Sequence, residues 1–188
     1  MNRVDHSLLL LATQDVLVVC ADLGVIPVLV GGLAVAKLAF ARPTKDVDVM
    51  ILYDSANAET VISSLLRHGF RARFENLQEF AKQNHMVTVE HVATGSYVNI
   101  SLGSTLFEQE ILERSQMFIS DALTIRIISA EDLVILKSIA FQPKDLEDIR
   151  NIVSYHPTLN RLRIQHWVEA YAKQLDLPDR WREIAKLL

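Results

Sequence analysis

The stretch Val28-Leu-Val-Gly31-Gly32-Leu-Ala-Val-Ala-Lys-Leu-Ala-Phe-Ala-Arg-Pro-Thr-Lys-Asp46-Val-Asp48-Val-Met-Ile-Leu52 decides the fold of this chain. Its last seven residues begin with strict polar–apolar alternation, which is typical of a β-strand with one buried face. Side chains along a strand point alternately to opposite faces, so residues two apart share a face. Asp46 and Asp48 therefore stand side by side on one face, and the apolar residues between and after them point into a core.

The two carboxylates and the glycine pair upstream of them indicate a site for a metal ion and a phosphate. Closely spaced oxygen ligands suit a hard cation such as Mg²⁺ or Mn²⁺, which binds a few carboxylates and leaves room for substrate phosphates. Gly31 and Gly32 open an expected helix, where backbone N–H groups can approach an anion. Metal on one side and phosphate on the other predict nucleotide chemistry.

Composition bounds the remaining possibilities. The chain has 188 residues, of which 50% are hydrophobic, so a sizeable core can form. A net charge of −4 argues against broad, non-specific binding of nucleic acid, which needs a basic face. The single cysteine, Cys20, allows no disulfide within one chain, and we expect a buried thiol in a reducing cytoplasm. No apolar run is long enough to span a bilayer, so we expect no membrane partner.

The order of expected elements predicts an α/β (α+β) fold, with a mixed sheet flanked by helices and a helical C-terminal extension. We expect an α/β domain over residues 1–128 and a helical extension over residues 129–188. Expected helices cover 5–23, 33–40, 56–68, 76–83, 104–115, 129–140, 143–154, 159–175 and 178–187; expected strands cover 26–30, 45–52, 70–74, 85–92 and 97–102, with two short ones around Phe118 and Ile125.

The ordered motifs resemble those of a known superfamily. The succession of strand, Gly31-Gly32, short helix and a strand carrying Arg-x-Thr-x-Asp-x-Asp over residues 42–48 is similar to the DNA polymerase β-type nucleotidyltransferases. Within that superfamily the chain most resembles the minimal bacterial branch related to the AbiEii toxin-type nucleotidyltransferases. The segments 129–137 and 144–149 also look like the "P-E-D-L…K" and "K-D-x-x-D" helices of these proteins.

The resemblance implies transfer of a nucleoside monophosphate from an NTP to an acceptor, with release of pyrophosphate. Two Mg²⁺ ions would bridge Asp46, Asp48 and the triphosphate and neutralise its charge. The acceptor is expected to be a small molecule, a protein side chain or an RNA end. The expected nucleotide contacts are Gly31, Gly32, Arg42, Thr44, Lys45 and Lys137. The alternative for Lys137 is an exposed helix face with no ligand. In the same way, Lys144 would form only surface pairs with Asp145 and Asp148.

The chain departs from the family pattern at Asn99. Active members carry a third carboxylate on a later strand, and the corresponding stretch here reads Tyr97-Val-Asn99-Ile-Ser101. Asparagine is neutral, a poorer metal ligand than aspartate, and no base. A hairpin turning at residues 93–96 would place Glu90 opposite Asn99, and we hypothesise that Glu90 supplies the missing carboxylate.

Three functions therefore stay open on the sequence. The first is a Mg²⁺-dependent nucleotidyltransferase, because two carboxylates can still hold metal and phosphoryl transfer depends mainly on positioning and charge stabilisation. The second is a catalytically reduced member of the same fold that binds a nucleotide or a partner protein, as in a toxin–antitoxin or regulatory pair. The third is an interaction module, and a homodimer is compatible with each.

Overall fold

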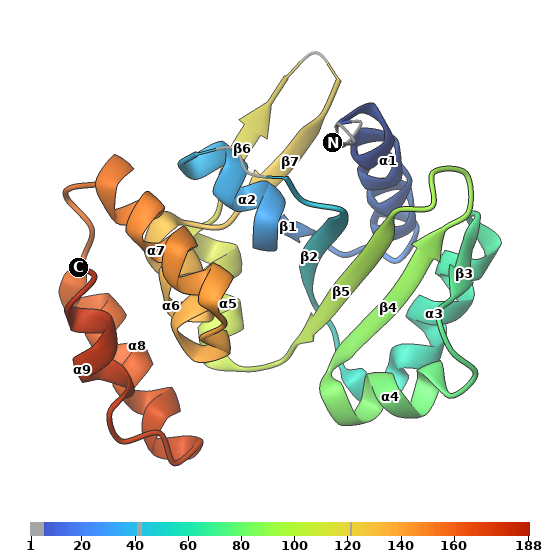
Figure 1. Ribbon diagram of the computed structural model, residues 1–188. Helices are drawn as coiled ribbons and strands as arrows, with labels where there is room; N and C mark the ends of the chain where they lie inside the picture. Colours follow the sequence, from blue (N-terminus) through green and yellow to red (C-terminus); the bar gives the residue numbers. More distant parts are fainter. Residues whose placement is uncertain (1–5, 41–42, 121) are drawn as a thin grey trace. The chain divides into compact units, whose positions relative to one another are not determined.

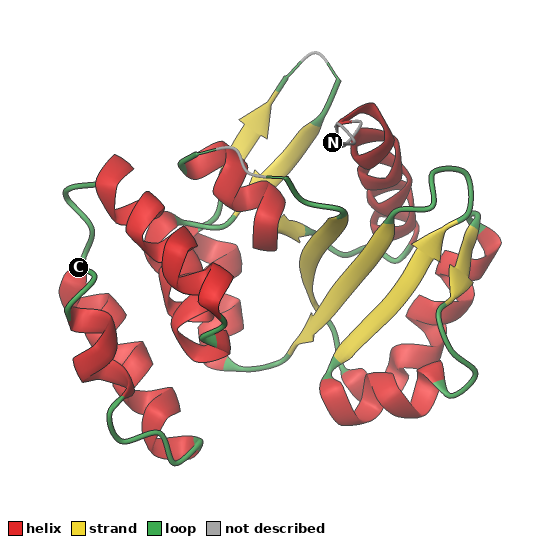
Figure 2. Ribbon diagram, viewed as in Figure 1, coloured by secondary structure: helices red, strands yellow, loops and turns green. Residues whose placement is uncertain are grey.

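The computed structural model describes residues 6–40, 43–120 and 122–188, and these divide into two compact units. The first unit comprises the described parts of Met1–Leu33 and Pro43–Ile127, and the second comprises the described parts of Ala34–Arg42 and Ile128–Leu188. Arg42, an expected nucleotide contact, lies outside the described residues. Figure 1 follows the chain by colour, and Figure 2 separates its helices from its strands.

The first unit contains a seven-stranded mixed sheet, which confirms the expected fold class. Its strands follow the order β3-β4-β5-β2-β1-β7-β6, and Figure 1 shows β2, β5 and β4 running side by side. The strands β2 and β5 run parallel, as do β1 and β7, whereas the other neighbours are antiparallel. The strands are β1 (Val28–Leu29), β2 (Asp46–Leu52), β3 (Phe70–Ala72), β4 (Met86–His91), β5 (Tyr97–Gly103), β6 (Gln116–Ile119) and β7 (Thr124–Ile127).

Helices flank this sheet and close its core. The helices of the unit are α1 (His6–Asp22), the first turn of α2 (Gly31–Leu38), α3 (Ala58–Arg67), α4 (Leu77–Asn84) and α5 (Leu106–Arg114), with a short 3₁₀ turn, η1, over Ser55–Asn57. Val47, Val49, Val98 and Ile100 are completely buried on one face of β2 and β5. Helix α1 contacts β2, and α3 contacts β3 and β4. The opposite face of β2, β4 and β5 carries the half-buried side chains of Asp46, Asp48, Glu90 and Asn99 and is called the open face below.

The turn between β4 and β5 differs from the expected one. The sequence placed the turn at residues 93–96, but His91 pairs with Ser96 through its backbone N–H, and Gly95 supplies a left-handed φ of +69° in the turn. The expected opposition of Glu90 and Asn99 is therefore wrong: Glu90 faces Tyr97, and Thr88 faces Asn99. A slip of two residues keeps every side chain on its predicted face, so the alternation in the sequence could not reveal it.

The second unit is helical and holds the remainder of α2 with α6 (Ala130–Ala140), α7 (Pro143–Tyr155), α8 (Arg161–Gln174) and α9 (Arg180–Ala185). Ser129 begins α6 as its N-cap, because its hydroxyl accepts the N–H of Asp132. Helix α6 contacts α7, α8 and α9 and is the central element of this unit. Within the described chain, every helix is too short or too polar to cross a membrane.

Candidate functional site

The first strand of the candidate site is β2, which carries both aspartates half-buried on the open face of the sheet. The carboxylate of Asp46 has no hydrogen-bond or ion-pair partner among the residues that the structure describes. Val30 donates its N–H to the backbone carbonyl of Asp48 over 2.9 Å, which holds the start of α2 against the strand. Two like charges on one strand face, one of them unpaired, are arranged to receive a cation.

Gly31 brings the chain directly against Asp48. Its φ is +63°, a left-handed conformation that favours glycine. A Cβ built on Gly31 would lie 2.6 Å from both Cβ and Cγ of Asp48, and nearer still to its Oδ2. Helix α2 begins at this residue, and the first N–H groups of a helix have no partners within the helix. The glycine thus places a helix N-terminus beside the carboxylate, where those N–H groups favour an anion.

Asn99 completes the centre of the site from β5. It lies directly opposite Asp48 in the parallel pair, and its amide Nδ2 donates to Asp48 Oδ1 over 2.8 Å. Thr88 on β4 donates its hydroxyl to the amide oxygen of Asn99 over 3.0 Å. The hydroxyl of threonine can also accept, so the same pair can hold the amide in the reverse orientation, with its oxygen toward the aspartates.

The donor set fits a hard divalent cation. Asp46 and Asp48 offer carboxylate oxygens, and Asn99 can offer a carbonyl oxygen after its amide turns over. In the described part of the chain, no group of three or more His, Cys, Asp or Glu side chains is arranged to hold a metal. A Mg²⁺ ion needs no such group, because it is commonly bound by one or two carboxylates together with waters and substrate phosphates.

Glu90 takes a different place from the one expected. It faces Tyr97 instead of Asn99, and its two carboxylate oxygens bind the guanidinium of Arg71 on β3 at 3.1 and 2.7 Å. The side chain of Glu90 is 21% exposed, so this bidentate pair is partly shielded from water. The carboxylate expected to replace the missing one is therefore engaged by an arginine.

Two expected contacts precede β2. Thr44 is buried, and its hydroxyl lies 3.5 Å from the backbone carbonyl of Asp46, where it helps to hold the start of the strand. Lys45 is exposed, and no hydrogen bond or ion pair joins it to the described residues. Both lie in the first unit beside the aspartates in sequence, and their contact with a nucleotide stays a prediction.

Lys137 belongs to the second unit and is buried there, contrary to the exposed surface position considered above. Its Nζ contacts Asp145 at 2.9 Å and Asp148 at 2.6 Å, and both carboxylates are buried as well. The alternative of surface pairs around Asp145 and Asp148 is therefore wrong. The apolar residues of α6 and α7 around them exclude water, and only mutual pairing makes buried charges tolerable.

Sequence reasoning assigned no role to Arg73 or Tyr97. The guanidinium of Arg73 lies 4.0 Å from the centroid of the Tyr97 ring, on the open face of the sheet. Because side chains alternate along a strand, the sequence already indicated that Tyr97 shares a face with Asn99. The contact of Arg73 with Tyr97 could not be predicted in the same way, because it depends on the pairing of β3, β4 and β5.

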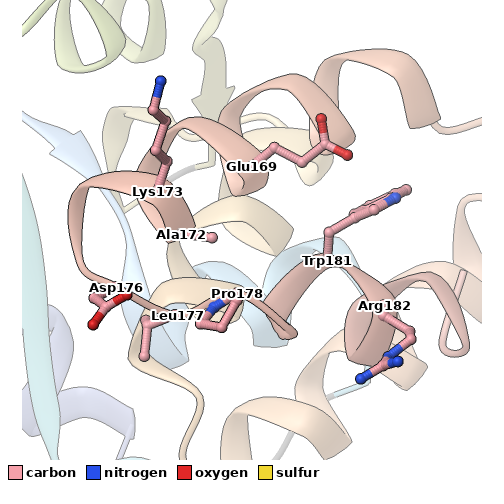
Figure 3. A pocket seen from close by; sticks show the side chains of 8 residues that line it. All are labelled: Glu169, Ala172, Lys173, Asp176, Leu177, Pro178, Trp181 and Arg182. Atoms are coloured by element: carbon pink, nitrogen blue, oxygen red, sulfur yellow. The ribbon is translucent and has the colours of Figure 1, made fainter.

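A hollow in the second unit lies between α8 and α9, with a volume of about 480 Å³, and shares no residue with the aspartate site. Figure 3 shows its lining, which includes Glu169, Lys173, Trp181 and Arg182. Carboxylates and cations are mixed along its walls, so its charge favours no particular ligand.

Comparison with solved structures supports the fold. The chain resembles the solution structure of the antibiotic-resistance factor ANT(2″)-Ia, with a TM-score of 0.60 and 11% identity over 95% of this chain and 97% of that one. It resembles the lincomycin-bound lincosamide antibiotic adenylyltransferase LnuA, with a TM-score of 0.55 and 19% identity over 82% and 99%. It also resembles an antigenic nucleotidyltransferase-like protein from Paracoccidioides brasiliensis, with a TM-score of 0.52 and 17% identity over 92% of each chain.

Comparison with family models gives the family itself. No curated protein sequence matches the chain. The model of the nucleotidyl transferases of unknown function, DUF2204, matches residues 10–177, which is most of the chain. The match spans the glycine pair, both aspartates and the buried lysine cluster, and it agrees with the polymerase β-type superfamily expected from the motifs. The chain therefore belongs to the DUF2204 family of nucleotidyl transferases.

Proposed function

We propose that this protein transfers a nucleoside monophosphate from an NTP to the hydroxyl group of an acceptor, in a reaction that depends on Mg²⁺ or Mn²⁺. One observation carries the proposal: Gly31 places the N-terminus of α2 against Asp48, so an anion-binding helix end and a carboxylate pair meet at one point. Membership in a nucleotidyl transferase family supports the same reading.

The residues divide the work by position. Asp46 and Asp48 would hold the metal, which when bound neutralises the triphosphate and favours in-line displacement. The first N–H groups of α2 would bind phosphate oxygens, and Lys45 would add a positive charge at the entrance to β2. The acceptor oxygen attacks the α-phosphorus as the bond to the bridging α,β-oxygen breaks. The electron pair of the broken P–O bond leaves with pyrophosphate, and the proton of the acceptor hydroxyl passes to water.

The acceptor is proposed to be a hydroxyl-bearing molecule. ANT(2″)-Ia has been crystallised with adenylyl-2″-tobramycin, and LnuA with lincomycin, so this fold can host nucleotidyl transfer to small molecules. A protein side chain and an RNA end remain the other candidates, since each also offers a hydroxyl group.

A second candidate function rests on Asn99. Its amide donates a hydrogen bond to Asp48 and so occupies one carboxylate oxygen that a metal would need. A neutral amide also cannot take the proton of an attacking hydroxyl. A protein of this kind would bind a metal–nucleotide complex and act through a partner protein, as a toxin–antitoxin pair or a regulator does, without turning the nucleotide over.

One experiment separates the two functions. The protein is incubated with each labelled NTP and Mg²⁺ or Mn²⁺, and nucleotide binding and pyrophosphate release are measured. Asp48→Asn is expected to abolish both, whereas Glu113→Gln is the matched control, because Glu113 is an exposed carboxylate on α5 with no described partner. Binding without release would favour the second function, and the absence of any metal-dependent binding would refute both.

A further inference from the structure

The open face of the sheet continues beyond the aspartates as two rows of polar residues. The outer row runs across four strands through Asp46, Tyr97, Glu90 and Arg71, which are successive register partners. The inner row runs in the same direction through Asp48, Asn99 and Thr88. Residues in register lie on the same side of a sheet about 5 Å apart, so both rows share one face that starts at the proposed metal ligands. The outer row is the more exposed of the two, because Thr88 in the inner row is buried.

The two sides of the aspartate pair differ. On one side, Gly31 and the N-terminus of α2 pack against Asp48 and supply N–H groups for a triphosphate. On the other side lie β5, β4 and β3 with their open polar face. Because in-line displacement brings the acceptor to the α-phosphorus opposite the leaving pyrophosphate, the acceptor belongs on the side of β5.

Two arginines on that side differ in how their charge is compensated. Arg71 is neutralised by its bidentate pair with Glu90. Arg73 instead packs over the ring of Tyr97 at 4.0 Å, and it has no hydrogen-bond or ion-pair partner among the described residues. Tyr97 is 39% exposed and is the direct neighbour of Asp46 across the β2–β5 pair. The ring of Tyr97 thus holds the guanidinium of Arg73, which follows β3, over a residue of β5, the strand that neighbours β2.

We propose that Arg73, supported by Tyr97, binds a phosphate group of the acceptor, so that the acceptor of this enzyme is a phosphate-bearing molecule with a free hydroxyl. The inference rests on the proposed nucleotidyl transfer and names its substrate class. The planar fork of an arginine matches phosphate oxygens bidentately, and stacking on an aromatic ring fixes the plane of that fork. A phosphate held there leaves a hydroxyl of the same molecule to approach Asp46.

Two sources share this chemistry: a free nucleotide, and the 3′-terminal nucleotide of an RNA. The test therefore uses AMP in one arm and a short 5′-phosphorylated oligoadenylate with a free 3′-hydroxyl in the other, with unphosphorylated adenosine for comparison. Equilibrium dialysis measures the binding of each labelled probe while Mg²⁺ and a non-hydrolysable ATP analogue saturate the proposed triphosphate site. Binding of the analogue itself is measured first and reports on the proposed function alone.

Three variants give the readout. Arg73→Gln is expected to weaken binding of the phosphorylated probe roughly tenfold to a hundredfold, the range for one lost hydrogen-bonded contact to a charged group. Arg73→Lys keeps the charge without the fork and is expected to fall between Arg73→Gln and wild type. Arg67→Gln is the matched control, because Arg67 is exposed at the end of α3, the helix on the opposite face of the sheet.

The outcomes distinguish the two levels of the proposal. Loss of probe affinity in Arg73→Gln, with unchanged binding of the ATP analogue and an unchanged Arg67→Gln, supports the inference, and the tighter-binding probe identifies the source of the phosphate. Equal affinity of wild type and Arg73→Gln for both phosphorylated probes overturns the inference and leaves nucleotidyl transfer standing. A wild-type protein that binds neither the ATP analogue nor any other NTP in the presence of Mg²⁺ overturns the proposed function and the inference with it.

Discussion

The contact between Gly31 and Asp48 predicts a large effect for the smallest possible substitution, Gly31→Ala. Alanine at a φ of +63° carries a penalty of about 1–2 kcal/mol, partly offset by about 0.4–1 kcal/mol from the stiffer unfolded chain. The new methyl group would also lie 2.6 Å from Asp48 Cβ, an atom that no rotamer change can move away. Overpacking of this kind costs a further ~1–3 kcal/mol.

Gly24→Ala is the matched control for this prediction. Gly24 has nearly the same φ, +67°, but a Cβ there would meet no atom within 4 Å, so only the backbone penalty applies. Thermal unfolding is measured for both variants, and each kcal/mol corresponds to roughly 2–4 °C in a chain of this size. We expect Gly31→Ala to melt at least several degrees below Gly24→Ala and to lose Mg²⁺-dependent binding of nucleotide. Equal melting temperatures, or wild-type binding by Gly31→Ala, would refute the reasoning.

Three further predictions concern other positions. Lys137→Met leaves the buried carboxylates of Asp145 and Asp148 without a cation and is expected to lower the free energy of unfolding, measured in urea titrations, by about 3–5 kcal/mol. Replacing both aspartates by asparagine in the same variant should restore part of that stability. Asn99→Asp exchanges a hydrogen bond to Asp48 for a like charge, so without metal the free energy of unfolding should fall by about 1.5–3 kcal/mol. Melting curves should show that Mn²⁺ restores this stability, and a loss that metal leaves unchanged would contradict the proposed site. Burial raises the pKa of Cys20 from 9.0 to about 12, so the native protein should resist alkylation by iodoacetamide in mild alkali. The stability contributed by this thiol is complete below pH 9 and is lost as pH rises toward 12. Rapid alkylation of the folded protein would disprove the burial of this thiol.

Local patterns in the sequence were sufficient for most elements of the fold. The alternation after Lys45 predicted β2, and Val47, Val49 and Ile51 are indeed buried while both aspartates stay half-exposed. Ser129 marked the start of α6 because a cap is decided by neighbours a few residues away. The left-handed φ at Gly31 follows from glycine itself, since few other residues adopt it without strain.

The tertiary structure alone decided what surrounds these residues. The pairing of Asp48 with Asn99 joins residues 51 positions apart in the sequence. The register of β4 against β5 depends on a turn whose position the alternation of polar and apolar residues cannot reveal. The sequence likewise could not separate an exposed Lys137 from a buried one, because burial is a property of packing between helices. The sequence by itself determined which side chains share a face; folding determined which faces, charges and hydrogen bonds meet, because those contacts connect residues far apart along the chain.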